Sequence, residues 1–380
     1  MICVAMKITK KKDILRQFCQ YSVLAIGVVL LATTPACGGS AASSAAPAPL
    51  TSAATLRQAG DARNIKIGTA AQARLLGQAD YTGVLGREFS QLEGEYEMKF
   101  DPSHPRPDTD PNPYDLSLGE QLVSFAQAHN MAVRGHTLVW HEAVPAWVKN
   151  GGYSAAQLNT ILQGHITTVV KLYSGRIYAW DVYNEAFNDD GTVRGSIWYD
   201  APGIGMAGQG TRTIEQALRW ARAADSRVKL FYNDYGTETA NPKSDAIYAM
   251  AQDFKQRGVP LDGIGFQMHV ELSLNHPSTI AALAANLKRF ADLGLEVQIT
   301  ELDIRLPSND AAMLTQQAAL YGQIVSTCAK QPKCTAIQTW GFTDKYSWIP
   351  GFFKGFGWAL PFDDQYGKKA AYNSYVKGLQ

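Results

Sequence analysis

Short apolar runs rich in β-branched and aromatic residues recur along the chain from about residue 65 onwards. Each run has the length of a buried strand. The runs cover residues 65–70, 89–94, 132–138, 178–184, 228–233, 263–269, 296–301 and 335–340. Stretches of helical character separate them and cover residues 72–87, 117–129, 154–173, 211–224, 242–257, 279–293 and 310–330, with a last one at 368–379.

The alternation of strands and helices predicts an α/β fold with parallel strands, because each connection is long enough to hold a helix. Eight such units are the number that closes a (β/α)8 TIM barrel. The helix boundaries are marked by Ser154 and Ser278 as N-caps, Pro242 in a first turn, and Gly258 and Gly294 after helical segments. We therefore predict one barrel domain over residues 57–380.

The first 36 residues have a different pattern. A basic stretch from Lys7 to Arg16 precedes ten apolar or small residues at 23–32, and small residues follow. This order is typical of a secretory signal peptide. The apolar run is about half of the ~20 residues that span a bilayer. We therefore expect an exported protein rather than a permanent transmembrane helix.

The end of the predicted signal allows two outcomes. Thr-Pro-Ala before Cys37 suits ordinary cleavage and secretion. Cys37 followed by two glycines also resembles a bacterial lipoprotein, in which that cysteine is acylated and anchors a surface or periplasmic protein, although Thr34 stands where such signals usually carry Leu. In either case residues 37–56, rich in Ala, Ser and Pro, predict a flexible tether.

Composition and charge narrow the class of partner. The chain has 35 basic and 34 acidic residues, and removal of residues 1–36 leaves a net charge of −3. That balance excludes general attraction to nucleic acid, and it leaves a lipid anchor as the expected route to a membrane. Beyond Cys37 only Cys328 and Cys334 remain, and an oxidising compartment favours a disulfide between them. We expect a monomer.

Polar and aromatic side chains gather where the predicted strands end, which in a barrel is one face. Glu185 ends the fourth strand and Glu301 the seventh. Two carboxylates among aromatic rings indicate glycosidic bond cleavage, in which one donates a proton to the leaving oxygen and the other stabilises or captures the anomeric carbon. No metal-ligand spacing organises this face, because Pro145 stands where an HExxH motif starting at His141 needs its second histidine. No metal or cofactor is expected.

Six segments resemble motifs of the family 10 glycoside hydrolases, the endo-1,4-β-xylanases. They are GHTLVWH at 135–141, WDVYNEA at 180–186, LFYNDY at 230–235, GIGFQMH at 263–269, ITELDI at 299–304 and WGFTDKYSW at 340–348. They occur in family order and cover roughly residues 60 to 380. The resemblance implies a TIM barrel that hydrolyses internal bonds of xylan or xylo-oligosaccharides with retention of configuration.

The resemblance also implies roles for individual residues. Glu185 corresponds to the general acid/base, Glu301 to the nucleophile, and His269 and Asp303 to the pair that orients the nucleophile. In a retaining enzyme the two carboxyl groups lie about 5–5.5 Å apart. The implied substrate-binding residues are Glu95, Lys99, His136, Trp140, Asn184, Tyr235, Gln267, Trp340 and Trp348. Cys328 and Cys334 match the position of a family disulfide, whereas Trp180 and Trp198 are expected in the core.

The chain departs from the family pattern at two places on the glycone side. Tyr96 replaces an expected Asn and Phe100 an expected Trp, and Glu142 and Ala143 follow His141 where the family usually has Ser or Asn and then Gln. Two hydrogen-bonding groups are thereby lost, and such groups account for much of sugar discrimination. We therefore predict an atypical glycone subsite, shaped for a particular side-chain decoration.

Three other interpretations are weighed against a xylanase. A non-catalytic polysaccharide-binding lipoprotein on the same barrel would keep the aromatic residues and lose a catalytic carboxylate, but Glu185 and Glu301 are both present. A related β-glycanase or transglycosylase stays open, because two glutamates do not select the sugar. The GxGxxG pattern at 203–208 lacks a βαβ setting, which disfavours nucleotide binding.

Overall fold

A computed structural model describes residues 55–380 of the chain. The predicted signal peptide, Cys37 and all but the last two residues of the predicted tether lie outside the described residues. Helix α1 (Leu56–Asp61) begins one residue before the predicted start of the barrel domain, and its N-cap Thr55 accepts a hydrogen bond from the Gln58 backbone. Within residues 55–380, every helix is too short or too polar to cross a membrane.

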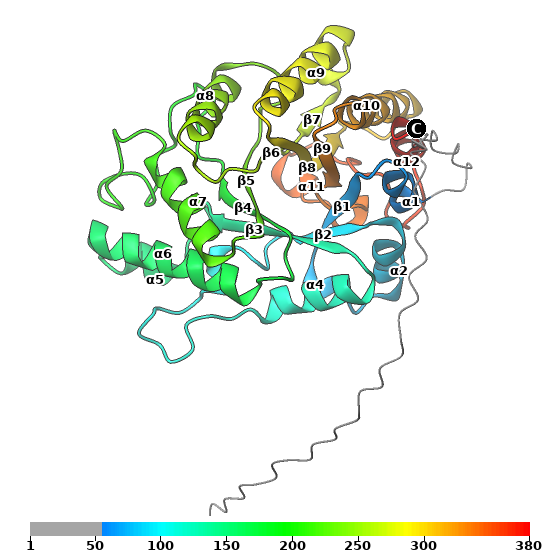
Figure 1. Cartoon of the computed structure of the whole chain (residues 1–380). Helices are drawn as coiled ribbons and strands as arrows, with labels where there is room; N and C mark the ends of the chain where they lie inside the picture. The colour runs from blue at the N-terminus through cyan, green and yellow to red at the C-terminus, as the bar shows by residue number, and fades with distance from the viewer. Residues whose placement is uncertain (1–54) are drawn as a thin grey trace, which may run out of the picture. The chain divides into compact units, whose positions relative to one another are not determined.

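Eight parallel strands close into a barrel around the core (Figure 1). Neighbouring strands pair in chain order from β1 to β6, β9 lies between β1 and β8, and pairing of β6 with β8 completes the ring. The strands are β1 (Lys66–Ala71), β2 (Gln91–Gly94), β3 (Ala132–Val139), β4 (Ala179–Asn184), β5 (Lys229–Asp234), β6 (Gly263–Phe266), β8 (Glu296–Arg305) and β9 (Cys334–Thr339), and a short β7 (His269–Glu271) pairs with the end of β8. The predicted TIM barrel is confirmed.

Helices cover the outside of the barrel, so nearly all strand residues are buried on both faces. The larger ones are α2 (Ala79–Glu88), α4 (Ser117–Ala128), α6 (Ala155–Leu172), α7 (Arg212–Ala224), α8 (Pro242–Gln256), α9 (Pro277–Asp292), α10 (Ala311–Ala329) and α12 (Ala370–Gly378). Shorter ones are α3 (Phe100–Ser103), α5 (Ala146–Asn150), α11 (Ile349–Phe352), η1 (Ala73–Leu75), η2 (Leu272–Leu274) and η3 (Asp344–Tyr346).

Local sequence signals explain most helix ends. Ser154 caps α6 in a capping box with Gln157, and Pro242 occupies the first turn of α8. The prediction that Ser278 caps α9 is wrong. That helix begins at Pro277, and the preceding His276 accepts the hydrogen bond from the Ser278 backbone, because Pro277 takes the first helical position itself.

Two predicted elements are broken in the structure. Residues 72–87 form η1 and then α2, because the Glu97 carboxylate accepts a hydrogen bond from the Ala73 backbone at 2.6 Å and holds the chain just after β1. The predicted strand 263–269 is divided into β6 and β7, because Met268 has a φ of 66°, which turns the chain out of the extended conformation. Both breaks lie at the ends of strands.

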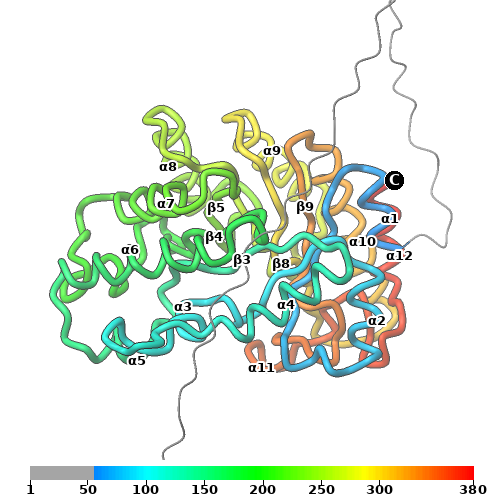
Figure 2. Tube along the Cα trace, turned by 60° about the horizontal axis from the view of Figure 1, so that its bottom comes forward, coloured from blue at the N-terminus to red at the C-terminus, as the bar shows by residue number. Residues whose placement is uncertain are grey.

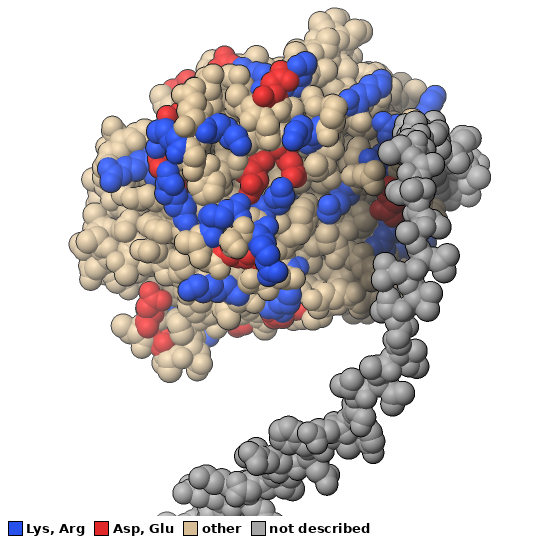
Figure 3. All heavy atoms as spheres, in the orientation of Figure 1, with Lys and Arg blue, Asp and Glu red and all other residues tan. Residues whose placement is uncertain are grey.

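The connections after the strands gather on one side of the barrel. In Figure 2, α5 and α11, which follow β3 and β9, lie along the lower edge. The opposite face, seen in Figure 3, carries Lys and Arg side chains interspersed with Asp and Glu rather than a patch of one sign. A disulfide joins Cys328 near the end of α10 to Cys334 at the start of β9, as predicted, with a Cα–Cα distance of 5.5 Å.

Stacked rings fill the core behind the β3 and β4 ends. The Phe100 ring lies 3.6 Å from the His165 ring and 5.5 Å from the Trp198 ring, all nearly parallel, and His104 stacks on Tyr114 at 4.1 Å. Burial lowers the pKa of His104 to about 4 and the pKa of His165 well below its usual value. The folded protein therefore holds both imidazoles neutral.

We expect these two histidines to make the fold sensitive to acid. The unfolded chain protonates them below about pH 6.5 whereas the folded chain does not, so stability falls as the pH drops from about 6.5 towards 4. His104 alone accounts for about 3 kcal/mol over that window. Denaturant midpoints should fall less between pH 7 and 4 in His104→Phe/His165→Phe than in the wild type. The exposed control His276→Asn, which keeps a capping oxygen, should follow the wild type, and parallel curves for all three would contradict the expectation.

Candidate active site

Glu185 follows the last residue of β4 and lies at the mouth of the barrel. Its carboxylate accepts a hydrogen bond from Trp140 Nε1 at 2.8 Å, one from Gln267 Nε2 at 3.0 Å and one from Asn184 Nδ2 at 3.2 Å. The side chain is still 13% exposed, so a ligand in the mouth can reach it. Three fixed donors therefore set the orientation of this carboxylate.

Glu301 lies within β8 and is buried. Its Oε1 accepts a hydrogen bond from Asn233 Nδ2 at 2.7 Å, and its Oε2 lies 3.0 Å from His269 Nε2. Burial raises the pKa of Glu301, but the hydrogen bond from His269 and the attraction of His136 outweigh it, so the pKa is lowered overall. Glu301 is therefore ionised at neutral pH, as a nucleophile must be.

A chain of hydrogen bonds supports Glu301 from behind. His269 Nδ1 lies 2.8 Å from Asp303 Oδ2, which also accepts a hydrogen bond from Trp348 Nε1 at 2.8 Å. Burial lowers the pKa of His269, but Asp303 and Glu301 together raise it to about 10. The imidazolium therefore donates to a carboxylate on each side. The structure brings these residues together as the sequence predicted.

Amide side chains connect the two glutamates. Asn233 Nδ2 donates to Glu301 Oε1 and also to Asn184 Oδ1 at 2.9 Å, while Asn184 Nδ2 donates to Glu185. Gln267 Nε2 contacts both Asn184 Oδ1 and Glu185 Oε1. The two carboxylates therefore share one network in which each has separate donors.

Lys99 lies between two tryptophan rings at the same mouth. Its Nζ is 4.4 Å from the ring centre of Trp140 and 5.5 Å from that of Trp340. Burial lowers the pKa of Lys99, whereas the nearby carboxylates of Glu301 and Glu185 oppose that shift. A cation between aromatic walls offers both a hydroxyl donor and an apolar surface, which suits a sugar ring.

His136 is fixed by the residues below it. Its Nδ1 lies 3.0 Å from Asp181 Oδ2, and its ring meets the Trp340 ring edge-on at 5.3 Å. Asp181 also accepts hydrogen bonds from Arg134, which donates in turn to Gln298. This buried ion pair holds the imidazole at the mouth.

The remaining predicted site residues, Glu95 and Tyr235, have polar partners of their own. Glu95 accepts a hydrogen bond from Gln72 Nε2 at 2.7 Å, and burial raises the pKa of Glu95 to about 7. Tyr235 accepts one from Arg194 Nη2 at 2.7 Å. The predicted catalytic and substrate-binding residues thus lie in the later parts of barrel strands or in the connections that follow them, and their roles stay predictions.

A comparison with known proteins agrees with this arrangement. The family model described as Glycosyl hydrolase family 10 matches residues 55–378, which is nearly the whole described chain. The chain belongs to glycosyl hydrolase family 10. The resemblance inferred from the six segments is therefore confirmed.

The relatives of this family 10 hydrolase include characterised xylanases. It is 43% identical over 323 residues to endo-1,4-β-xylanase B of Thermotoga neapolitana, covering 83% of this chain and 89% of the relative. It is 39% identical to endo-1,4-β-xylanase C of Phanerodontia chrysosporium, covering 84% and 77%. The crystal structure of xylanase 10B from Thermotoga petrophila RKU-1 in complex with xylobiose is 42% identical with a TM-score of 0.80, covering 86% of this chain and 97% of that one.

Sequence reasoning left two site residues of this family 10 hydrolase without a role. Asn233 contacts both Asn184 and Glu301, and His141 Nδ1 lies 3.9 Å from Glu185 Oε2. Both residues stand in motifs at strand ends, and that position indicated that they lie near the site. The hydrogen bond between Asn233 on β5 and Glu301 on β8 could not be predicted from either motif alone. Trp180 and Trp198 are buried as predicted, and Trp198 Nε1 donates to the Trp140 carbonyl.

Within the described chain, one group of side chains has metal-ligand spacing. Ligand atoms of Glu93, His136 and Asp181 lie within 4.8 Å of one another, and all three residues are buried. Arg134 already places its guanidinium on Asp181 and lies 3.5 Å from Glu93 Oε2. Burial raises the pKa of Glu93 well above its usual value. We interpret the group as a buried Arg134–Asp181 ion pair with Glu93 and His136 beside it rather than as a metal site.

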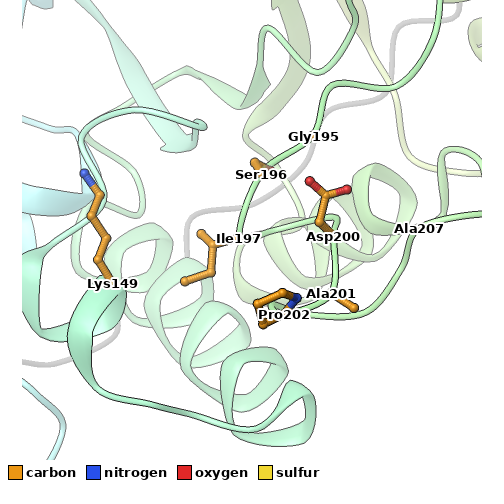
Figure 4. A pocket seen from close by; sticks show the side chains of 8 residues that line it. All are labelled: Lys149, Gly195, Ser196, Ile197, Asp200, Ala201, Pro202 and Ala207. Atoms are coloured by element: carbon orange, nitrogen blue, oxygen red, sulfur yellow. The ribbon is translucent and has the colours of Figure 1, made fainter.

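A separate surface pocket of about 690 Å³ lies beside the long connection after β4 (Figure 4). Lys149 stands on one side, and Ile197, Asp200 and Pro202 on the other. The GxGxxG segment at 203–208 adjoins it, but β4 ends at Asn184 and α7 begins only at Arg212. A dinucleotide-binding turn instead joins a strand directly to a helix.

Proposed function

We propose that this family 10 hydrolase is a retaining endo-1,4-β-xylanase that cleaves internal β-1,4 bonds of xylan. The observation that carries the proposal is the contrast between its two glutamates. Glu301 is buried and held ionised by His269, whereas Glu185 is partly exposed and oriented by neutral donors. One residue suits the nucleophile and the other suits proton transfer.

In the first step Glu301 attacks the anomeric carbon, and the bond to the leaving sugar oxygen breaks. Glu185 gives its proton to that oxygen, so the product leaves as a neutral alcohol and a glycosyl ester of Glu301 forms. Positive charge develops on the sugar ring in the transition state, and the negative charge that remains on Glu301 stabilises it. We expect Asn184 to donate to the sugar 2-hydroxyl, an interaction that strengthens at this point.

In the second step a water molecule displaces Glu301 from the anomeric carbon. Glu185, now a carboxylate, takes a proton from a water molecule whose oxygen attacks the anomeric carbon, and Glu301 leaves as a carboxylate. The ester has no charge on Glu301, which removes a repulsion that would disfavour ionised Glu185. Two inversions give net retention, which requires the carboxyl groups to be about 5–5.5 Å apart.

The choice of xylan rests on the relatives. Proteins 39% to 43% identical over most of this chain are named endo-1,4-β-xylanases, and a structure 42% identical holds xylobiose. The experiment that tests the choice is reducing-sugar release from xylan, cellulose and mannan. We expect release from xylan in clear preference to the other two, and binding to xylan without cleavage would contradict the proposal.

The atypical glycone subsite remains part of the proposal. Tyr96 is 46% exposed, and its hydroxyl donates to Asp101 Oδ2 at 2.7 Å, while the Asp101 backbone donates to the Ala143 carbonyl at 2.9 Å. The two departures from the family pattern are thus joined through Asp101. This link supports a locally reshaped subsite in which Tyr96 is turned to Asp101 rather than to a sugar hydroxyl.

Replacing Tyr96 and Ala143 by the residues usual in the family should therefore change which xylo-oligosaccharides the protein prefers. We expect Tyr96→Asn with Ala143→Gln to lower KM for linear xylotetraose about tenfold, because two hydrogen bonds of about 0.5–1.5 kcal/mol each are regained. Discrimination in favour of substituted xylo-oligosaccharides should decrease. Product profiles from linear and substituted substrates measure both effects, and an ordinary ladder in the wild type that the double variant leaves unchanged would overturn the subsite proposal.

A further inference from the structure

Lys243 is a buried cation whose partners lie beside the acid/base residue. It stands in the first turn of α8, its side chain is 1% exposed, and its Nζ lies 2.8 Å from Asp234 Oδ1. Lysine is almost never fully buried, and the N-terminal turn of a helix disfavours a positive charge. Two unfavourable conditions at one position indicate that the cation is needed there.

One branch runs from Lys243 to the peptide group after Glu185. Asp234 accepts a hydrogen bond from the Tyr232 hydroxyl, and the same hydroxyl oxygen accepts the Ala186 N–H at 2.9 Å. Burial raises the pKa of Asp234 to about 7 against the attraction of Lys243. The lysine therefore favours the ionised form of Asp234, which accepts from the Tyr232 hydroxyl while the hydroxyl oxygen accepts the Ala186 N–H.

A second branch runs from Lys243 to the carbonyl of Glu185 itself. The Lys243 ammonium lies 3.3 Å from the ring centre of Tyr235, whose hydroxyl accepts a hydrogen bond from Arg194 Nη2. Arg194 Nε in turn donates to the Glu185 carbonyl at 2.9 Å. The cation on the ring face fixes the tyrosine that holds the arginine.

The loop that carries Arg194 packs against the beginning of α8. Phe187 and Val193 form an antiparallel bridge, which returns the chain from β4 towards Glu185. At the turn, a Cβ on Gly191 would lie 2.6 Å from the Pro242 carbonyl oxygen, and its φ is 83°. Only glycine fits this approach. The loop that carries Arg194 is therefore held against the start of α8 by backbone packing, in addition to the side-chain contacts of the two branches.

The residue that both branches reach, Glu185, has an unfavourable backbone conformation. Glu185 has a φ of 56°, a left-handed value that non-glycine residues seldom adopt. Its N–H donates to the Asn233 carbonyl at 2.9 Å, its carbonyl accepts from Arg194, and the next N–H donates to Tyr232. We propose that Lys243 is a positioning residue for Glu185, because it holds both branches that fix the peptide groups on either side of the acid/base. The inference rests on the proposed role of Glu185.

The test compares substrates that do and do not need a proton donor. Lys243→Met should lower kcat/KM for xylotetraose about 10- to 100-fold, a part of the 10²–10⁴-fold contribution of a general acid. With dinitrophenyl β-xylobioside, whose leaving group departs unprotonated, kcat/KM should change by less than about threefold. Lys243→Arg should recover much of the loss. The matched control Lys288→Met, at an exposed lysine paired with Asp292, should leave both substrates unaffected.

The alternatives give distinct results. Equal losses with both substrates, or no loss with either, would overturn a role through Glu185. If thermal unfolding shows that Lys243→Met is not folded, Tyr232→Phe replaces it, because this change removes only the hydroxyl that links Asp234 to the Ala186 N–H. Tyr232→Phe should then show the same loss confined to xylotetraose. A wild type inactive on xylotetraose and on the aryl xylobioside would contradict the proposed function itself, whereas an active wild type with unselective variants contradicts only the inference.

Discussion

Glu301→Gln is expected to abolish xylan hydrolysis, with turnover at least about 10⁴-fold below the wild type. Glutamine keeps the shape and can still accept from Asn233, but its amide cannot attack the anomeric carbon or carry the charge that His269 stabilises. Since no glycosyl ester forms, the loss should be as severe with dinitrophenyl β-xylobioside as with xylan. Initial rates with both substrates measure it.

The fold should survive this change, because glutamine has nearly the volume of glutamate and its amide oxygen can still accept from Asn233. Glu271→Gln is the matched control. That glutamate lies on the short strand β7, forms an ion pair with Arg305, and should retain activity close to the wild type. Substantial hydrolysis by Glu301→Gln would show that another group supplies the nucleophile.

Glu185→Ala is expected to lower turnover of xylan by about 10²–10⁴-fold, because general acid/base catalysis contributes that range. With dinitrophenyl β-xylobioside the first step should be almost unchanged, since the leaving group needs no proton. The glycosyl ester should then accumulate, because no base activates water. A burst of dinitrophenolate followed by a slow phase measures this directly.

Azide provides a further criterion for the same variant. In the space left by the glutamate, azide can attack the anomeric carbon of the glycosyl ester without a base and release Glu301 as a carboxylate. The slow phase should therefore accelerate with azide and give β-xylobiosyl azide, whereas Glu301→Gln should not respond. Absence of both the burst and the azide effect would remove Glu185 from the role of acid/base.

The fold and the principal site residues could be predicted from the chain because they depend on local signals. Buried parallel strands form continuous apolar runs, and the residue that ends each run lies at one mouth of the barrel. That geometry places Glu185 and Glu301 together although 116 positions separate them. Ser154 and Pro242 likewise mark helix starts through chemistry confined to a single turn.

What could not be predicted depends on contacts between distant segments. The role of Asn233 comes from hydrogen bonds to β4 and β8, and that of Lys243 from its contacts with Asp234, the last residue of β5, and with Tyr235, which follows it. The break between η1 and α2 follows from a carboxylate of the next strand's loop, Glu97, which binds the Ala73 backbone. Propensity and periodicity describe a segment by itself, so a partner from another strand is invisible to them.

The central claim is that Glu301 and Glu185 act together by double displacement, and the stereochemistry of the first product tests it most directly. Proton NMR during hydrolysis of xylotetraose by the wild type resolves the anomeric signals before mutarotation. The account predicts that the β-anomer appears first and the α-anomer grows in only at the rate of mutarotation. Initial appearance of the α-anomer, or no cleavage of xylotetraose at all, would contradict it.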